Sequence, residues 1–141
     1  MIKTVFASCT VFIGFAAAAV AQINTQLCMQ PPEVGVWQNE FAETHQVSRL
    51  EIAFHCDGNG PYGRWEVRAL MKCAPRDCTW GRTGAQRDEK GRLVSRFRTY
   101  NADRFLLFEA RNGRLELFNL NVPRDPGKRR NSARYTLFPE E

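Results

Sequence analysis

The sequence contains only two histidines, His45 and His55, and none of the usual patterns that mark a catalytic centre. It has no Gly-x-Ser-x-Gly, no His-Glu-x-x-His and no ordered set of Ser, His and Asp. A general base or a metal ligand needs a partner group within reach, and neither histidine has an evident one. His55 also falls on the outward side of its predicted strand. We therefore expect no catalytic residue, no metal and no cofactor, and we interpret the chain as non-enzymatic.

The chain beyond residue 21 also lacks any segment that fits a helix better than a strand. Apolar and polar side chains alternate instead, most clearly in RLEIAFHC and RWEVRALMKC, and a period of two is typical of half-buried antiparallel strands. Asn112-Gly113 lies between two such runs and predicts a tight hairpin. The predicted strands cover residues 34–40, 47–56, 62–73, 79–84, 92–100, 103–110, 114–122 and 133–139.

Eight consecutive strands with short connections predict an all-β fold, an antiparallel meander with one apolar face. Such a sheet exposes an edge at each end, and closure into a barrel removes both edges. We therefore expect a closed or nearly closed small β-barrel, with a two-sheet β-sandwich as the alternative. The interior of an eight-stranded barrel is either filled by side chains or holds one small ligand.

A long apolar run is absent except at the beginning of the chain. About 18 apolar residues follow Lys3 and end in the small-residue triplet Ala19-Val20-Ala21. This pattern predicts a signal peptide over residues 1–21, although an uncleaved membrane anchor is the alternative. Residues 22–33 then form an N-terminal extension, and residues 34–141 form a single β-barrel domain. We expect the protein to be exported, either to the periplasm or to the exterior.

The four cysteines beyond the leader predict two disulfides, because their number is even and the expected compartment is oxidising. Cys73 and Cys78 flank a tight Ala-Pro-Arg-Asp turn, which brings them within bridging distance. A zinc site or a thioredoxin-like pair would need a different spacing and context. Cys28 and Cys56 lie at neighbouring ends of the first predicted hairpin, so we expect them to form the second bridge.

Two stretches carry a family resemblance. Val34-Gly35-Val36-Trp37 resembles the Gly-x-Trp element that begins the barrel of the calycins, the lipocalin and avidin group. Residues 73–81 resemble the Cys-x-Pro-x-Asp-Cys-x-Trp-Gly signature of a family of small secreted bacterial proteins without an assigned activity, and Gly113-Arg114-Leu115 matches its later hairpin strand. Relatives carry Trp-Gly ahead of the first cysteine, where this chain has Leu70-Met71. The resemblance implies a β-barrel fold and leaves the function open.

The aromatic residues are spread over at least six predicted strands. Such a distribution is typical of a packed barrel core or of a lined cavity. As candidate ligand-binding residues we select Trp37, Trp65, Trp80 and Tyr100. Residues 105–108 place apolar groups on both faces of one strand, which predicts a second contact surface, either a self-association interface or a covering loop.

Arginine supplies 16 of the 20 basic residues, and the net charge is about +4 once Lys3 is removed with the leader. Four cations cluster in a Pro- and Gly-rich segment and are candidate anion-binding residues: Arg124, Lys128, Arg129 and Arg130. A solvated loop is the ordinary alternative. A weaker cationic set lies on the outer face of one strand, formed by Arg92, Arg96 and Arg98.

These features predict a non-enzymatic exported binding domain for a small apolar ligand or for an anionic envelope component. The alternative is a protein-protein interaction module, such as an inhibitor of an exported hydrolase. A modest basic excess attracts anionic polymers and lipid head groups. We do not expect nucleic acid as a partner, because an exported protein seldom meets it.

Overall fold

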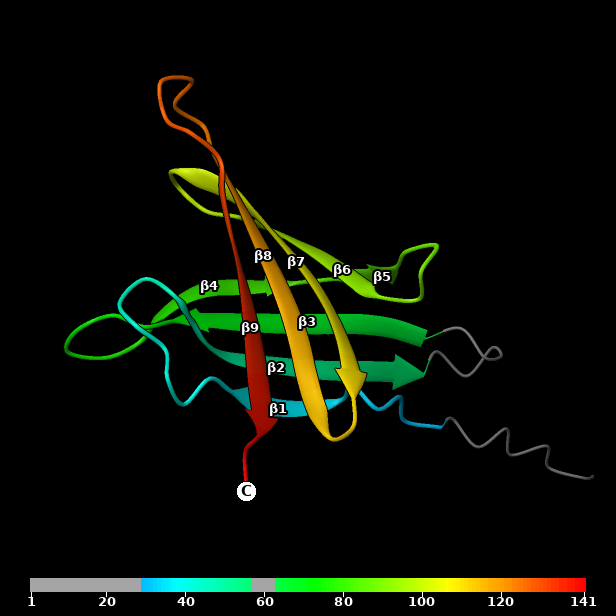
Figure 1. Cartoon of the computed structure of the whole chain (residues 1–141). Helices are drawn as coiled ribbons and strands as arrows, with labels where there is room; N and C mark the ends of the chain where they lie inside the picture. The colour runs from blue at the N-terminus through cyan, green and yellow to red at the C-terminus, as the bar shows by residue number, and fades with distance from the viewer. Residues whose placement is uncertain (1–28, 57–62) are drawn as a thin grey trace, which may run out of the picture.

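The computed structural model describes residues 29–56 and 63–141 (Figure 1). The predicted signal peptide, residues 1–21, and Cys28 lie outside this range. Every regular element within it is a strand: β1 (Gly35–Gln38), β2 (Val47–Cys56), β3 (Gly63–Met71), β4 (Cys78–Thr83), β5 (Ala85–Arg87), β6 (Leu93–Arg98), β7 (Ala102–Arg111), β8 (Arg114–Pro123) and β9 (Asn131–Pro139). The prediction of an all-β fold is confirmed for the described residues.

The strands form one antiparallel sheet in the order β4-β3-β2-β1-β9-β8-β7-β6-β5. Consecutive strands are neighbours, as predicted for a meander, except that β4 and β5 do not pair. The first strand pairs with the last, through Trp37 with Pro139 and Gln38 with Phe138. The two edges of the sheet are therefore β4 and β5, and strand pairs do not close it into a complete ring.

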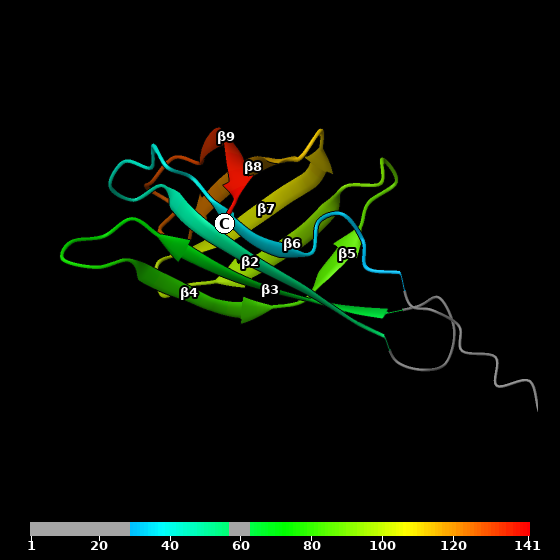
Figure 2. The same ribbon diagram turned by 90° about the horizontal axis from the view of Figure 1, so that it is seen from below.

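The sheet has nine strands because residues 85–87 form a short separate strand, β5, which pairs with β6. Sequence reasoning predicted eight, since three residues are too few to show an alternating pattern. Gly84 alone separates β5 from β4. At this glycine the chain passes from one half of the sheet to the other, and Figure 1 shows β1–β4 running across β6–β9. Figure 2 shows the same two halves from below, one in front of the other.

The apolar faces of the two halves pack together to form the core. Leu50 of β2 and Val67 of β3 are fully buried, and so are Leu106 of β7 and Leu115 of β8. Each side chain of this kind contributes about 1.5–3 kcal/mol when it leaves water. The predicted alternation is confirmed in the middle of β2 and β3, where side chains of the predicted inner face, such as Ile52 and Val67, are buried. It is wrong at the end of β2, where Cys56 of the same predicted face is exposed.

The described end of the predicted N-terminal extension packs against the sheet through Glu33. The Glu33 carboxylate is almost fully buried and accepts hydrogen bonds from both terminal nitrogens of Arg87 on β5, at 3.2 and 3.0 Å. The backbone carbonyl of Glu33 accepts a hydrogen bond from Trp37 Nε1 at 2.9 Å. Arg87 also stacks over the Trp65 ring, 5.3 Å from its centroid. This segment therefore links β1 to the far edge of the sheet.

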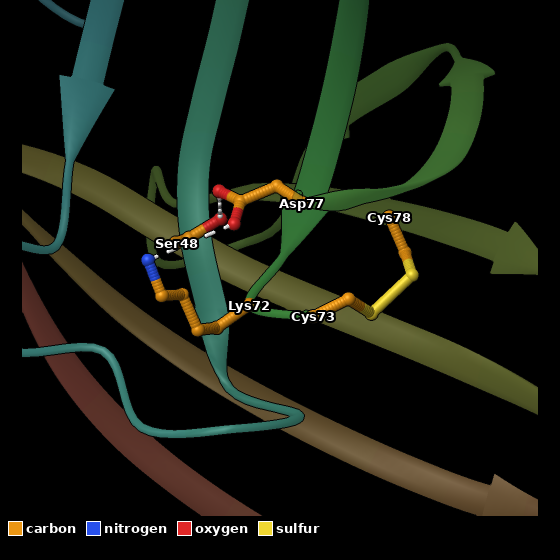
Figure 3. The surroundings of a disulfide bond; sticks show 5 residues. All are labelled: Ser48, Lys72, Cys73, Asp77 and Cys78. Carbon is orange, nitrogen blue, oxygen red and sulfur yellow. Dashed lines mark hydrogen bonds and ion pairs between the residues drawn. A yellow bond between two sulfur atoms is a disulfide. The ribbon is translucent and has the colours of Figure 1, made fainter. Parts of the chain in front are cut away.

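The predicted disulfide between Cys73 and Cys78 is confirmed, and it closes the turn from β3 to β4 (Figure 3). Asp77, inside this turn, accepts a hydrogen bond of 2.5 Å from the Ser48 hydroxyl on β2. The Lys72 ammonium lies 3.9 Å from the other carboxylate oxygen of Asp77. A short cross-link and a partly buried hydrogen bond thus hold the turn against the sheet.

The second predicted bridge cannot be placed in the same way. Cys56 is disulfide-bonded, but Cys28 lies outside the described residues. The pairing of these two cysteines stays a prediction.

Candidate functional site

The structure separates the four predicted ligand-binding aromatics. Trp37 and Trp65 are buried in the core, and Trp80 is half-buried against it, with its ring 5.8 Å from that of Phe97. Tyr100 lies in the turn between β6 and β7 and is fully exposed. The structure therefore does not gather all four side chains at one place, and their ligand-binding role stays a prediction.

The four predicted anion-binding cations lie on the loop between β8 and β9, which extends away from the rest of the molecule in Figure 1. Arg124 forms an ion pair with Asp103 at 3.3 Å. Lys128, Arg129 and Arg130 are exposed and form no ion pair with any described residue. Three adjacent cations of this loop are therefore available to an external anion.

The weaker cationic set is partly neutralised within the fold. Arg92 pairs with Asp88 at 2.7 Å and Arg96 pairs with Asp103 at 2.6 Å. Arg98 is exposed and forms no ion pair within the described part of the chain. The set therefore offers one unpaired charge rather than three.

A polar pocket of about 340 Å³ lies between the β1–β2 loop and strands β7–β9. Its volume is at the lower end of the range for small-molecule sites, which begins at about 300 Å³. All of its lining side chains except one are polar, and none is acidic: Thr44, His45, Gln46, Arg104, Asn119, Asn121, Asn131, Ser132, Ala133 and Tyr135. The exposed residues of this lining are Thr44, His45, Asn131 and Ser132.

The strand register explains why these polar groups meet. Arg104 on β7 is the cross-strand partner of Asn121 on β8, and Asn119 on β8 is the partner of Ala133 on β9. Along β7, Arg104 is on the same face as the buried Leu106, because side chains of a strand alternate between its faces. The inner face of β7 and β8 is therefore apolar toward one end and polar toward the other.

Arg104 carries an uncompensated charge at the polar end of this inner face. Among the arginines of the described ranges that form no ion pair, only Arg104 is not exposed. The others are Arg64, Arg76, Arg98, Arg114, Arg129, Arg130 and Arg134. Its guanidinium carbon lies 4.5 Å from the centroid of the Trp80 ring, and its Nε is buried without a hydrogen-bond partner. A buried charge is costly unless it is paired.

Other polar atoms around Arg104 also have no hydrogen-bond partner. These are the side-chain oxygens of Asn119 and Asn121 and the indole nitrogen of Trp80. Buried polar side-chain atoms in folded proteins nearly always have a partner, so each exception needs an explanation. Six such atoms occur in the described residues, and three of them belong to residues that line one cavity, Arg104, Asn119 and Asn121. The Trp80 nitrogen lies beside Arg104, whereas the other two, Arg49 Nε and Ser95 Oγ, belong to residues that do not line this pocket.

Burial lowers the pKa of Arg104 below its ordinary value. The guanidinium nevertheless stays charged at neutral pH, because arginine does not lose its proton in proteins. Burial also raises the pKa of Tyr135 above its ordinary value of 10.0, while Asn119 and the charge of Arg104 act in the opposite direction. The phenol is therefore neutral at pH 7, and the pocket carries a positive charge with no negative one.

The β1–β2 loop is held over the pocket by backbone hydrogen bonds to Lys72. The amide of His45 donates to the Lys72 carbonyl at 2.9 Å, and the Lys72 amide donates to the Gln46 carbonyl at 2.8 Å. His45 adopts a positive φ of 69°, a conformation that is uncommon for residues other than glycine. Sequence reasoning treated His45 as an ordinary loop residue, and the structure adds that it lines the pocket. His55 is exposed, as predicted.

Sequence reasoning did not select Arg104, Asn119, Asn121 or Tyr135. A signal was present, since each lies at an even spacing from a buried leucine of its own strand. The alternation thus placed a cation and two amides on the inner face of the sheet. The inner face of β7 could not be recognised from the alternation, because both faces of the strand are apolar at residues 105–108.

No family model, curated protein or solved structure matches this chain. The resemblance to the calycins and to the small secreted bacterial family therefore stays a prediction. Across residues 29–56 and 63–141 there is no helix that is long and apolar enough to cross a membrane. The same residues contain no group of three or more His, Cys, Asp or Glu side chains that could hold a metal ion.

Proposed function

We propose that this chain is an exported, non-enzymatic binding domain that holds a small polar molecule in the pocket between the β1–β2 loop and β7–β9. The observation that carries the proposal is the group of buried polar atoms without partners on Arg104, Asn119 and Asn121. A fold gains no stability from such groups, because each has lost its contact with water. A ligand that restores their hydrogen bonds accounts for all of them at once.

The polar lining favours a polar ligand over the apolar one that the sequence predicted. The apolar half of the interior is filled by side chains such as Leu106, Leu115 and Leu137, each without exposed surface. In this proposal the curled sheet acts as a nearly closed barrel, since β1 pairs with β9 and only Gly84 separates the edge strands β4 and β5. The barrel supplies a rigid wall, and the β1–β2 loop covers the bound molecule.

The Cys73–Cys78 disulfide supports the export part of the proposal. Disulfides persist in oxidising compartments and are rare in the cytosol. The leader predicted over residues 1–21 would direct the chain to such a compartment, either the periplasm or the exterior.

Native mass spectrometry of protein purified from its own host tests the proposal. The expected result is a small-molecule adduct that disappears on denaturation. Ala133→Phe places a ring in the pocket and should abolish the adduct. Thr136→Phe introduces the same ring on the outer face of the same strand, where Thr136 contacts Glu116, and should retain it. An adduct that survives Ala133→Phe would contradict the assignment to this pocket, and a protein-sized adduct would favour the interaction module instead.

A second function, binding to an anionic envelope component, is favoured by the exposed cations Lys128, Arg129 and Arg130. These three side chains are adjacent, and none forms an ion pair with a described residue. Clustered charges keep an appreciable potential at physiological ionic strength, where screening acts over about 8 Å. None of these three side chains lines the pocket, so both functions can act in the same protein.

A further inference from the structure

We propose that the ligand of the polar pocket is a small acid whose oxyanion group, a carboxylate or a phosphate, binds to Arg104. This inference rests on the proposed function and specifies its ligand. It follows from the charge of the pocket, from the position of Arg104 and from the free acceptors beside it.

The charge of the pocket selects an anion. None of the lining residues is acidic, and Arg104 forms no ion pair with the described part of the chain. Among the arginines of the described residues, every other one is either exposed or paired with a carboxylate. The molecule thus neutralises its partly buried guanidinium groups, with Arg104 as the exception. An incoming oxyanion would supply the missing countercharge, and a guanidinium binds such groups through two parallel hydrogen bonds.

The position of Arg104 leaves a donor edge free for this purpose. Its guanidinium carbon lies over the Trp80 ring, 4.5 Å from the centroid, and this contact orders the side chain before a ligand arrives. Its Nε–H is buried and has no acceptor. A group ordered in advance loses little entropy on binding, which favours affinity.

The neighbouring amides define the rest of the ligand. The side-chain oxygens of Asn119 and Asn121 are buried acceptors without a donor, and Asn121 is the cross-strand partner of Arg104. These two acceptors favour a ligand that carries hydroxyl or amino donors close to its oxyanion. The volume of about 340 Å³ equals roughly ten water molecules at liquid density. Sugar acids, sugar phosphates, hydroxy acids and amino acids all fit this description.

The test compares acids with matched neutral molecules on ¹⁵N-labelled protein. The carboxylate arm is glucuronate and glycerate, the phosphate arm is glucose 6-phosphate and glycerol 3-phosphate, and the neutral arm is glucose and glycerol. NMR follows the Arg104 Nε–H signal and the side-chain amides of Asn119 and Asn121. We expect at least one acid to shift these signals in a saturable manner and to bind at least tenfold more tightly than its neutral counterpart.

Variants separate the role of Arg104 from that of the pocket. Arg104→Gln should weaken acid binding by at least tenfold, whereas Arg114→Gln, which alters an exposed unpaired arginine on β8, should leave it unchanged. Asn121→Leu should weaken the binding of the acids and of any neutral molecule that binds, because all members of the panel carry hydroxyl groups. If Arg104→Gln does not fold, the Arg104 Nε–H signal of the unaltered protein still decides the question.

The outcomes distinguish this inference from the proposed function. Equal binding of an acid and its neutral counterpart, with shifts at Asn119 and Asn121, would overturn the acid assignment and leave the binding pocket in place. Acid binding that persists in Arg104→Gln would likewise overturn the acid assignment and leave the binding pocket in place. An absence of shifts at all three side chains with every member of the panel would overturn both proposals.

Discussion

The guanidinium of Arg104 on β7 lies 4.5 Å from the centre of the Trp80 ring on β4. The two residues come from opposite halves of the sheet and meet where the core changes from apolar to polar. A cation over an indole ring contributes about 0.5–2 kcal/mol, depending on how far it is desolvated. This contact offsets part of the cost of burying the charge and keeps the guanidinium at the wall of the pocket.

Arg104→Met should leave the unliganded protein as stable as before, within about 1 kcal/mol, or make it more stable. Methionine replaces a buried unpaired charge with an apolar chain of similar length, and such replacements are often neutral or stabilising. Urea unfolding of both proteins measures the difference. Arg98→Met, at an exposed position, should change the free energy of unfolding by less than about 0.5 kcal/mol. A loss of several kcal/mol in Arg104→Met would show that the charge serves the fold rather than a ligand.

Asp77→Ala should lower the free energy of unfolding by about 1–3 kcal/mol, because the buried Ser48 hydroxyl loses its acceptor. The ion pair with the exposed Lys72 adds little. Urea unfolding under oxidising conditions measures the effect with the Cys73–Cys78 bridge intact. Asp125→Ala removes a carboxylate from an exposed turn and is the matched control. Equal effects of the two substitutions would contradict the role of Asp77 in holding the turn.

Acid stability should depend on Asp88. Its side-chain hydrogen bond from Arg92 is the main factor that lowers the pKa of this carboxyl below 3.8. A lowered folded-state pKa gives stability that is present above the unfolded value and lost as pH falls through the folded value. Urea midpoints measured from pH 5 downward should therefore fall less steeply for Asp88→Asn. Arg92→Gln should have the same effect to a smaller extent, because the backbone amides of residues 90 and 92 still donate to the carboxylate. An unchanged slope in either variant would exclude this pair as a contributor.

The exposed cations of the β8–β9 loop should act together on anionic surfaces. Replacement of Lys128, Arg129 and Arg130 by serine should markedly weaken binding to phosphatidylglycerol vesicles, with the melting temperature almost unchanged. Single alanine substitutions should be nearly silent, because each exposed contact contributes about 1 kcal/mol or less. Vesicle co-sedimentation over a series of salt concentrations measures the effect, and the affinity of the unaltered protein should fall as salt rises. Unchanged binding by the triple variant would make the loop an ordinary solvated surface.

Local sequence patterns predicted eight of the nine strands and the Cys73–Cys78 cross-link. Apolar alternation in β2 and β3 is a local property, since side chains of a strand point to opposite faces in turn. The Cys73–Cys78 bridge was equally local, because a four-residue turn leaves its two ends close together. The exposure of His55 followed from the same alternation.

Only the tertiary structure decided which strands meet and what gathers between them. The pairing of β1 with β9 and the change of sheet half at Gly84 depend on contacts between distant segments. Arg104 reads in the sequence as one of 16 arginines. It becomes the partner of Asn121 through the β7–β8 register, and the neighbour of Trp80 only when the two halves of the sheet cross. A local pattern specifies the face of the sheet on which a side chain lies. The contacts that this side chain makes in a pocket depend on residues that are far apart in the sequence and that only the fold brings together.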